Sequence, residues 1–440
     1  MEGIVSATTA DVLAPGFSTE PYWTDGLPPF EPPPREIGGS VDVAVVGAGY
    51  AGLSAALTLA RAGKTVVVFD AARVGSGASS RSAGSLGHVP KAGLADLKLS
   101  YGECIAHRVY AEAREAREYV ETVVRDHQIE CSLRTSGRFI AAHSARAFEK
   151  LRLSLPELRE TWGAVELVPR EAQRSVIGSD AYHGGLKLAT AATLQPALLH
   201  RGLARAALAA GAHLVQETRV TDIAANGPGF IVTSAAGAIK ARAVVLATNA
   251  ETGRETPTLR RLRQRMAIVP AYALVTEPIA PERMRHILPS NGPISDTCKI
   301  VHYMAPNENG ERLVMSARAG RSDGGLHEKA RRIFGYFAER FPELRGVRVT
   351  HCWTGRFALP GDWIPHIGTE DGLYYVLGCC GTGVPMSTYL GHKVALKILG
   401  DEGGATVFDR PLPPMSPWKR SPALLPLAVR VYDWRDRLFR

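Results

Sequence analysis

Apolar positions between residues 41 and 70 predict a strand, a helix and a second strand in direct succession. Val43–Val46 is a short, largely β-branched run, as expected of a strand buried on both faces of a parallel sheet. Residues 51–62 alternate leucines with small residues and predict a helix that Gly63 ends, and residues 65–70 predict the second strand. Two parallel strands joined by a helix are the repeating unit of a doubly wound α/β sheet.

The turn between the first strand and the helix carries three spaced glycines. Gly47, Gly49 and Gly52 have the G-x-G-x-x-G spacing. The first permits a tight turn, the second lets the backbone approach a pyrophosphate, and the third lets the helix pack closely on the sheet. Asp70 ends the second strand, about 20 residues further on, where an acid accepts a hydrogen bond from an adenosine ribose. This order predicts a dinucleotide site.

A second loop of small residues follows Asp70 and ends at Gly84. An FAD enzyme needs such a loop to enclose the extended cofactor, whereas a nicotinamide enzyme does not. The loop resembles the G-x-G-A-S-x-R-x-x-G signature of the D-amino-acid oxidase and glycine oxidase superfamily of FAD-dependent amine oxidoreductases. The resemblance implies that Ser79, Ser80 and Arg81 lie along the phosphates and ring of FAD. The cofactor-binding residues expected in this half are Gly47, Gly49, Tyr50, Ala51, Gly52, Asp70, Ala71, Gly77, Ala78, Ser79, Ser80 and Arg81.

The middle of the chain resembles the superfamily's second adenine-side unit. A helix is predicted from Pro196 to Gly211, followed by strands at 212–216, 230–233 and 241–247. The resemblance implies a backbone contact from Val220 to adenine, with Ala247 and Thr248 near the pyrophosphate. Ordinary packing of helix on sheet is the alternative interpretation for Val220.

Three ordered blocks near the C-terminus resemble the branch of γ-glutamylputrescine oxidoreductase and L-pipecolate oxidase. They are the W-x-G, D-x-x-P-x-x-G and G-x-x-G-x-G-V patterns at 353–355, 362–368 and 378–384, before a helix predicted at 386–399. The last block and the helix start would aim backbone N–H groups at the flavin N1/C2 edge, where the positive helix end stabilises the reduced flavin. The expected contacts are Gly381, Thr382, Gly383 and Val384.

Length, composition and element order predict two interleaved domains. The chain has 440 residues and is 45% hydrophobic, enough for two cores. The predicted fold class is α/β: a Rossmann-like FAD-binding domain of the GR2 type and an antiparallel-sheet substrate domain, discontinuous in sequence. The expected segments are an extended N-terminal arm at 1–37 anchored by Tyr22 and Trp23; an FAD-binding domain at 38–95, 190–255 and 350–410; a substrate domain at 96–189 and 256–349; and a tail helix within 411–440.

A strand predicted at 300–304 would belong to the substrate sheet. His302 and Tyr303 are adjacent on it, so only one of the two side chains can face the flavin. Many superfamily members carry an arginine for the substrate carboxylate on this strand, and the alignment puts Met304 near its position. Another arginine would then serve, or the substrate would lack a carboxylate there; the candidates are Arg318, Arg321 and Arg356, with Arg356 the first choice.

The candidate catalytic residues each have a structural alternative. His302 or Tyr303 would hydrogen-bond the amine, Trp353 would form an apolar wall, and Arg356 would bind a carboxylate; packing in the core is the alternative for the aromatic residues. His88, just past the flavin loop, is a candidate hydrogen-bond donor at the ring edge. No C-x-x-C occurs among the six cysteines, so neither a disulfide framework nor a metal site is expected.

Charge and hydropathy exclude several classes of partner. The net charge is +9, but no basic repeat or aromatic RNA-binding motif accompanies it, so nucleic acid is not an expected partner. No secretory signal pattern and no apolar run of membrane-spanning length occurs, which predicts a cytoplasmic protein. Docking of the basic tail on the FAD domain is favoured over membrane contact.

The expected function is FAD-dependent oxidation of a C–N bond in a small amine or amino/imino acid. The resemblance implies hydride transfer from the substrate to flavin N5, an imine that hydrolyses, and O2 or another electron acceptor. One alternative is a flavin-binding dehydrogenase subunit that passes electrons to a quinone or protein partner. Another is an NAD(P)-linked oxidoreductase, which predicts a second G-x-G-x-x-G unit near mid-chain that the sequence lacks.

Overall fold

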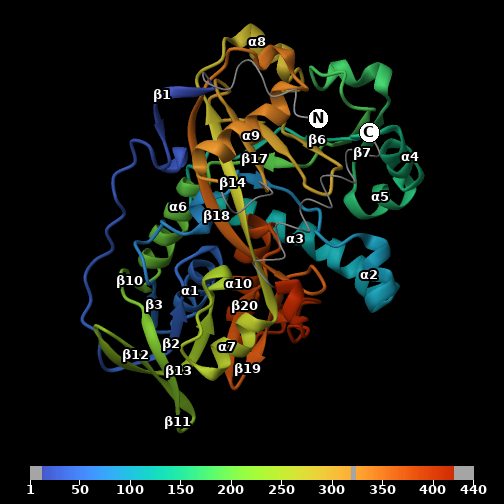
Figure 1. Ribbon diagram of the computed structural model, residues 1–440. Helices are drawn as coiled ribbons and strands as arrows, with labels where there is room; N and C mark the ends of the chain where they lie inside the picture. Colours follow the sequence, from blue (N-terminus) through green and yellow to red (C-terminus); the bar gives the residue numbers. More distant parts are fainter. Residues whose placement is uncertain (1–11, 319–323, 421–440) are drawn as a thin grey trace.

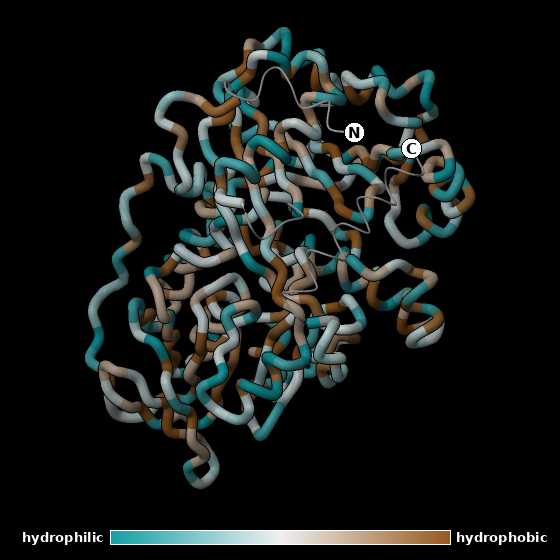
Figure 2. Tube along the Cα trace, viewed as in Figure 1, coloured by the Kyte–Doolittle hydropathy of each residue, from teal (hydrophilic) through white to brown (hydrophobic). Residues whose placement is uncertain are grey.

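The computed structural model describes residues 12–318 and 324–420 and contains two large β-sheets (Figure 1). An eight-stranded sheet lies in the lower half of the view, and a nine-stranded sheet in the upper half. Hydrophobic segments run through the interior of both halves, with hydrophilic residues concentrated on the outer loops (Figure 2). The predicted α/β class, with a Rossmann-like sheet and a second sheet, is confirmed.

The eight-stranded sheet is parallel at its centre, in the order β10-β3-β2-β13. Its first two strands in sequence, β2 and β3, lie before and after the glycine-rich turn and the helix that follows it. Both strands are largely buried, as their runs of valine predict. The strands are β2 (Ser40–Val46), β3 (Val66–Phe69), β10 (His213–Val215), β11 (Val220–Asn226), β12 (Gly229–Ser234), β13 (Gly237–Leu246), β19 (His366–Glu370) and β20 (Leu373–Leu377).

Four long helices pack with this sheet or with one another: α1 (Tyr50–Arg61), α3 (Glu103–Asp126), α6 (Pro196–Ala209) and α10 (Gly383–Leu399). Helices α1 and α10 come from opposite ends of the chain and are in close contact. A Cβ on Gly391 of α10 would overlap the carbonyl oxygen of Ala51 in α1, so glycine is required at that crossing. This contact brings the C-terminal glycine block beside the N-terminal one.

The nine-stranded sheet has the order β1-β18-β14-β17-β16-β15-β6-β8-β7. Its central strands are antiparallel, as predicted for the substrate side. Helix α9 (Leu326–Ala338) covers one face of this sheet. The strands are β1 (Leu13–Ser18), β6 (Arg138–Ala141), β7 (Val165–Val168), β8 (Gly185–Leu188), β14 (Met266–Thr276), β15 (Ile294–Asp296), β16 (Tyr303–Pro306), β17 (Leu313–Ala317) and β18 (Val349–Pro360).

Smaller elements complete the fold. A three-stranded sheet joins β4, β9 and β5 beside the second small-residue loop. The remaining strands and helices are β4 (Ser85–Leu86), β5 (Arg134–Thr135), β9 (Ala192–Thr193), α2 (Leu94–Tyr101), α4 (Ala145–Leu153), α5 (Leu155–Trp162), α7 (Pro257–Gln264) and α8 (Pro281–Ile287).

Several predicted boundaries differ from the structure. Helices α4 and α5 are separated at Ser154, because Pro156 has no N–H to continue the first helix. The strand predicted at 300–304 begins only at Tyr303. Residues 13–18 of the predicted arm form a strand of the larger sheet, and Trp23 of the arm is buried as an anchor.

One predicted domain boundary differs from the structure, and one predicted segment lies mostly outside the described residues. The boundary placed at residue 350 falls inside β18, which pairs along its length with β14 of the nine-stranded sheet. The first ten residues or so of the segment 350–410 therefore lie in that sheet rather than in the cofactor-side sheet. Most of the predicted tail helix, from residue 421 onward, lies outside the described residues.

Candidate active site between the two sheets

The glycine-rich turn after β2 requires glycine at two of its three motif positions. Gly47 has φ +106°, and a Cβ there would lie 2.8 Å from the carbonyl oxygen of Ala247. A Cβ on Gly52 would overlap the carbonyl oxygen of Gly47. Among residues 12–318 and 324–420, the only atom within 4 Å of a Cβ on Gly49 is Ser79 Oγ, at 3.0 Å, so the backbone there is open to approach.

Asp70 fixes the position of this turn through both carboxylate oxygens. Oδ2 accepts a 2.9 Å hydrogen bond from the backbone N–H of Ala48, and Oδ1 accepts one of 2.9 Å from Ala72. Ala71 lies between the two anchoring points and is exposed. Since a carboxylate offers about four lone-pair sites, Asp70 retains acceptor capacity for a ribose hydroxyl.

The second small-residue loop packs against the start of α1. Its 3₁₀ turn, Ala78–Arg81, begins after Gly77, and Ser79 Oγ accepts a 3.1 Å hydrogen bond from the backbone N–H of Tyr50. Ser80 Oγ is buried and has no hydrogen-bond partner among the described residues. Ala51 is buried in the first turn of α1, and the Tyr50 hydroxyl donates to the carbonyl oxygen of Pro196 at 2.9 Å.

Residues of the predicted adenine-side unit border the same turn. The backbone N–H of Ala247 donates to the Val46 carbonyl oxygen at 2.9 Å, which extends the parallel ladder to the glycine turn. The Thr248 and Thr252 hydroxyls lie 2.8 Å apart just beyond it. Val220 is 9% exposed and begins β11 at the rim of a hydrophobic cluster. Its contact with adenine stays a prediction.

The C-terminal block forms the start of α10. Gly381 has φ +81°, and Thr382 precedes the helix, with its hydroxyl donating to the Cys379 carbonyl oxygen at 2.9 Å. Gly383 is the first helical residue and Val384 is buried behind it. The side chain of the N-cap residue, Thr382, does not cap this helix start. Its N–H groups are therefore available to an anionic or carbonyl group.

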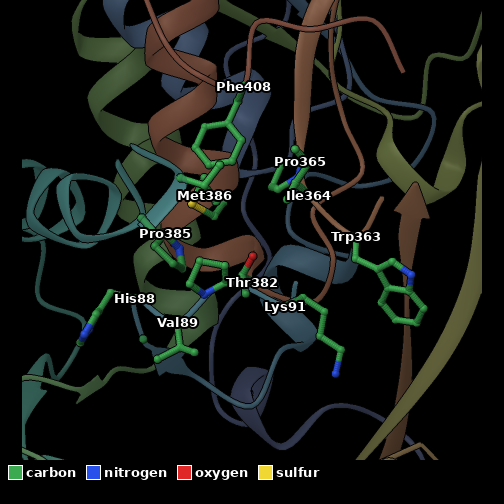
Figure 3. Close-up of a pocket in the computed structure, with 14 residues that line it drawn as sticks. His88, Val89, Lys91, Trp363, Ile364, Pro365, Thr382, Pro385, Met386 and Phe408 are labelled. Carbon is green, nitrogen blue, oxygen red and sulfur yellow. The ribbon is translucent and has the colours of Figure 1, made fainter. Parts of the chain in front are cut away.

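A pocket lies between the start of α10 and the loop that follows the flavin-loop signature (Figure 3). Thr382 and Pro385 line it from the helix, and His88 and Lys91 line it from the loop. Burial is the main cause that lowers the pKa of His88 to about 4, so this imidazole is neutral. Its Nε2 donates to the Trp162 carbonyl oxygen at 3.2 Å, and its buried Nδ1 has no partner among the described residues.

The nine-stranded sheet meets the cofactor loops through Trp353. Its indole Nε1 donates a 2.8 Å hydrogen bond to the Arg81 carbonyl oxygen, and a Cβ on Gly355 would lie 3.7 Å from the Arg81 side chain. Arg81 in turn donates from Nε to the Ser76 carbonyl oxygen at 2.8 Å. Trp353 has no exposed surface, so it connects the two halves as a buried residue.

The register of the paired strands shows which side chains lie on the same face of the nine-stranded sheet as Trp353. Trp353 pairs with Ala273, Ala273 with Ser316, and Ser316 with Tyr303, and residues directly opposite in neighbouring strands point the same way. Tyr303 therefore faces the cofactor loops. Its hydroxyl is buried without a hydrogen-bond partner among the described residues. Burial raises the pKa of Tyr303 to about 12, against the opposing effect of the nearby Arg138 cation.

Two arginines reach the same face of the sheet. Arg318 lies two residues after Ser316 and so points to the same side; its Cζ is 5.2 Å from the centroid of the Phe357 ring. That ring lies 3.7 Å from a Cβ placed on Gly381, which puts Arg318 near the start of α10. Arg138 on β6 donates from Nε to Ser295 Oγ at 3.0 Å, and its Cζ lies 5.8 Å from the Tyr303 ring centroid.

Comparison with known proteins decides the family. Residues 42–396 match the model of the DAO family, described as FAD dependent oxidoreductase. The chain belongs to this family of FAD-dependent oxidoreductases. It is 30% identical to γ-glutamylputrescine oxidoreductase of Escherichia coli (strain K12) over 366 residues, 82% of this chain and 84% of that protein. It is 25% identical to glycine oxidase of Bacillus licheniformis over 382 residues, 82% of this chain and 93% of that protein.

A solved relative supports the fold of this FAD-dependent oxidoreductase. Glycine oxidase from Geobacillus kaustophilus superposes with a TM-score of 0.68 and 23% identity, over 84% of this chain and 96% of that one. The residues described above fit FAD: the open backbone at Gly49, the orphaned Ser80 hydroxyl, the placement of Asp70 and the uncapped start of α10 suit an extended dinucleotide. None of the helices in residues 12–318 and 324–420 is long and apolar enough to cross a membrane.

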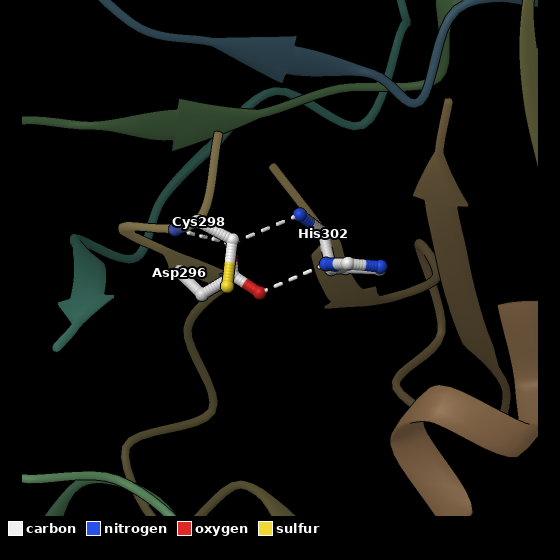
Figure 4. A group of neighbouring side chains, drawn as sticks. All are labelled: Asp296, Cys298 and His302. Carbon is white, nitrogen blue, oxygen red and sulfur yellow. Dashed lines mark hydrogen bonds and ion pairs between the residues drawn. The ribbon is translucent and has the colours of Figure 1, made fainter. Parts of the chain in front are cut away.

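His302 must be removed from the candidate catalytic residues of this oxidoreductase. Its ring stacks on Tyr336 of α9 with centroids 3.4 Å apart, and its Nδ1 donates to Asp296 Oδ2 at 3.0 Å (Figure 4). It therefore lies on the α9 side of the sheet, opposite to Tyr303, as alternation along a strand requires. Asp296, Cys298 and His302 offer ligand atoms within 4.8 Å of one another, but the Asp296 carboxylate already accepts hydrogen bonds from His302, Tyr336 and two backbone N–H groups.

Met304 does not lie on the face of the sheet where the carboxylate-binding arginine was expected. Met304 has no exposed surface and packs with Met315 and Leu274 in the core beneath α9. It cannot occupy a carboxylate subsite on the other face, so its identity gives no reason to exclude a carboxylate from the substrate.

Arg356, the first-choice carboxylate ligand, points away from the site. It alternates with Gly355 and Phe357, which face the cofactor side, and its Nε donates to Glu251 Oε1 at 3.0 Å. Its side chain is 56% exposed. Arg321 lies outside the described residues. Of the three candidate arginines, Arg318 is the one that the structure places at the start of α10.

Sequence reasoning missed Arg138 and Lys91. Arg138 has no motif of its own, and only the parallel pairing of β6 with β15 brings it beside Ser295 and Tyr303. Lys91 ends the loop after the flavin signature and lines the pocket at α10. Burial, followed by the neighbouring Arg318 cation, lowers the pKa of Lys91 to about 8. The sequence pointed to Lys91 only through its position seven residues after Gly84, where the flavin-loop signature ends.

Proposed function

We propose that this FAD-dependent oxidoreductase oxidises the C–N bond of a small amine or amino/imino acid that carries a carboxylate. The proposal rests on the surroundings of Arg318. This cation is partly buried near the start of α10, and no carboxylate lies at ion-pair distance from it among the described residues. A buried guanidinium without an anion is costly, and a substrate carboxylate supplies one with bidentate geometry.

The chain's own residues would bind and orient the substrate. Arg318 would hold the carboxylate, and the Tyr303 hydroxyl, on the same face of the sheet, would hydrogen-bond a more distant polar group of the substrate. Bound FAD supplies the acceptor for a hydride at N5, which converts the amine to an imine that water hydrolyses. For this oxidation the protein needs to orient the substrate and to stabilise the reduced flavin with the positive end of α10. A strong base is not needed, because the amine binds in its neutral form.

The related proteins support an amine as the substrate class. The two curated relatives are named as γ-glutamylputrescine oxidoreductase and glycine oxidase, and both names denote nitrogen-containing substrates. We propose O2 or another electron acceptor as the partner in the second half of the reaction, and a cytoplasmic location.

Anaerobic reduction of the bound flavin tests this function. Wild-type protein is mixed with glycine, D-alanine, L-pipecolate, sarcosine or γ-glutamylputrescine, and bleaching of the flavin absorbance is followed. We expect bleaching by at least one carboxylate-bearing amine. Arg318→Met should raise its half-saturating concentration at least about 100-fold, whereas Arg356→Met should leave it within about twofold. Retained flavin with no bleaching by any amine would contradict the proposal.

A further inference from the structure

The candidate site contains more positive charge than one carboxylate can balance. Lys91, Arg138 and Arg318 are all partly buried, and each has its pKa lowered by burial. Within residues 12–318 and 324–420, no Asp or Glu oxygen lies at ion-pair distance from the charged nitrogens of these three residues. Asp296 is the acid that acts on Arg138, but it lies on the other face of the sheet and is engaged by His302.

Arg138 and Arg318 lie at two ends of one face of the nine-stranded sheet. The guanidinium of Arg138 lies over Tyr303 on β16 and beside Gly87 of the cofactor loop, where a Cβ would be 3.7 Å from its Nη1. The guanidinium of Arg318 lies over Phe357 on β18. Strands β16 and β18 are separated by β17 and β14, so they lie about 14 Å apart at the usual strand spacing. Lys91 lines the pocket at the start of α10 with His88 and Thr382, and both arginine cations act to lower its pKa.

The Tyr303 hydroxyl marks the Arg138 end as a polar subsite. It is buried and has no partner at hydrogen-bond geometry among the described residues, Ser85 is a neighbouring hydroxyl, and the Tyr303 ring centroid lies 5.8 Å from the Arg138 Cζ. An unpaired cation and an orphaned hydroxyl at one place are both satisfied by a carboxylate, which accepts from each. At the other end, the Arg318 guanidinium over Phe357 can bind a second anionic group.

We infer that the substrate is a dicarboxylate: an amine or imino acid with carboxylates at opposite ends of its chain. This inference rests on the proposed function and specifies its substrate class. Arg318 binds one carboxylate, Arg138 with the Tyr303 hydroxyl binds the other, and Lys91, in the adjoining pocket, adds positive charge. Two carboxylates on a single carbon atom are too close together to reach both arginines across β17 and β14.

Binding of amine-free diacids tests the inference without turnover. Holoenzyme is titrated with succinate, glutarate, adipate, pimelate and suberate, and with butyrate to octanoate as monoacids of matched length. The readouts are the change in the visible flavin spectrum and the shift in Tm. We expect the dissociation constant to reach its minimum at adipate or longer, about 10- to 100-fold below that of the matched monoacid.

Variants assign the two ends. Arg138→Met and Arg318→Met should each weaken the best diacid about 10- to 100-fold and bring it to the level of the matched monoacid. Arg138→Lys, which keeps the charge but loses the bidentate geometry, should lose less. Arg152→Met, on the exposed side of α4, is the matched control and should change nothing. Far-UV circular dichroism and flavin content show whether each variant is folded.

Two outcomes would overturn the inference. Monoacids that bind as tightly as diacids would remove the second subsite, even if amines still reduce the flavin. Arginine variants that shift the flavin reduction potential but leave adipate affinity unchanged would show that the cations serve the cofactor. Tight diacid binding without flavin reduction by any amine would support the anion sites while contradicting the proposed oxidation, so the two proposals fail separately.

Discussion

The indole of Trp353 donates a 2.8 Å hydrogen bond to the backbone carbonyl of Arg81, and so joins the nine-stranded sheet to the second small-residue loop. One partner is a fully buried side chain on β18, and the other is the last residue of a 3₁₀ turn on the cofactor side. This bond, together with a 3.4 Å hydrogen bond from Arg81 Nη1 to the Thr354 carbonyl oxygen, helps to set the distance between that loop and the face that carries Tyr303.

Trp353→Phe should loosen that connection without unfolding the protein. Phenylalanine fills most of the same volume but cannot donate, so the Arg81 carbonyl loses a partner at a cost of about 1 kcal/mol. We expect the FAD dissociation constant to rise about fivefold, measured by equilibrium dialysis of reconstituted protein. Trp418→Phe, at a side chain that is 67% exposed, is the control, and an equal effect there would disprove a specific role for Trp353.

Gly49→Val should abolish FAD binding while the fold persists. Among the described residues a Cβ at this position has only Ser79 Oγ within 4 Å, but a branched side chain would occupy the predicted approach of the pyrophosphate. The purified variant should be colourless, with Tm close to that of the wild-type apoprotein. Gly38→Val, where the new side chain meets nothing within 4 Å, should stay yellow. Full flavin content in Gly49→Val would show that the pyrophosphate lies elsewhere.

Tyr303→Phe should impair substrate handling without reducing stability. Its hydroxyl has no partner among the described residues, so its removal leaves no protein group unsatisfied. The rate of anaerobic flavin reduction by the best amine, divided by the half-saturating concentration, should fall about 10- to 100-fold. Tm should stay within about 2 °C.

His302→Gln should show the reverse pattern to Tyr303→Phe. It removes the stack on Tyr336 and one hydrogen bond to the buried Asp296, which should cost about 1–3 kcal/mol of folding free energy. Urea unfolding of the holoenzyme measures this cost. Flavin reduction should change by less than about threefold, because the ring lies on the α9 side of the sheet. A large kinetic effect in a stable His302→Gln protein would place the histidine in the reaction after all.

Anion binding should weaken as the pH rises through about 8. The pKa of Lys91 is lowered to about 8, so the ammonium is charged below that pH and neutral above it. Adipate, whose carboxylates stay ionised throughout, should therefore bind more tightly at pH 7 than at pH 9. Lys91→Met should remove this dependence. Adipate affinity that is flat between pH 7 and 9 in the wild type would contradict the assignment of Lys91 to the site.

Local sequence patterns were sufficient for the cofactor half of the molecule. The strand, glycine turn, helix and acid between residues 41 and 70 are contiguous, so backbone sterics and short-range hydrogen bonds specify the turn at Gly47 and the position of Asp70. The extended 13–18 strand escaped prediction, because it forms only by pairing with β18 more than 300 residues away.

The substrate half depended on long-range register, and there the local alignment misled. Alternation along β16 required that His302 and Tyr303 face opposite ways, but it could not say which faces FAD. That was decided by pairing of Tyr303 with Ser316, Ser316 with Ala273 and Ala273 with Trp353.

The sequence by itself determined the cofactor, the family and the two-sheet architecture, because these follow from motifs within short stretches of chain. Only the tertiary structure showed that Arg356 pairs with Glu251 while Arg318 lies over Phe357 near the start of α10, and that Met304 is a core residue. It also brought Arg138 beside Tyr303. The physical reason is that a side chain's face on a β-strand is set by which partner strand it pairs with and in which register, and those partners are distant in sequence.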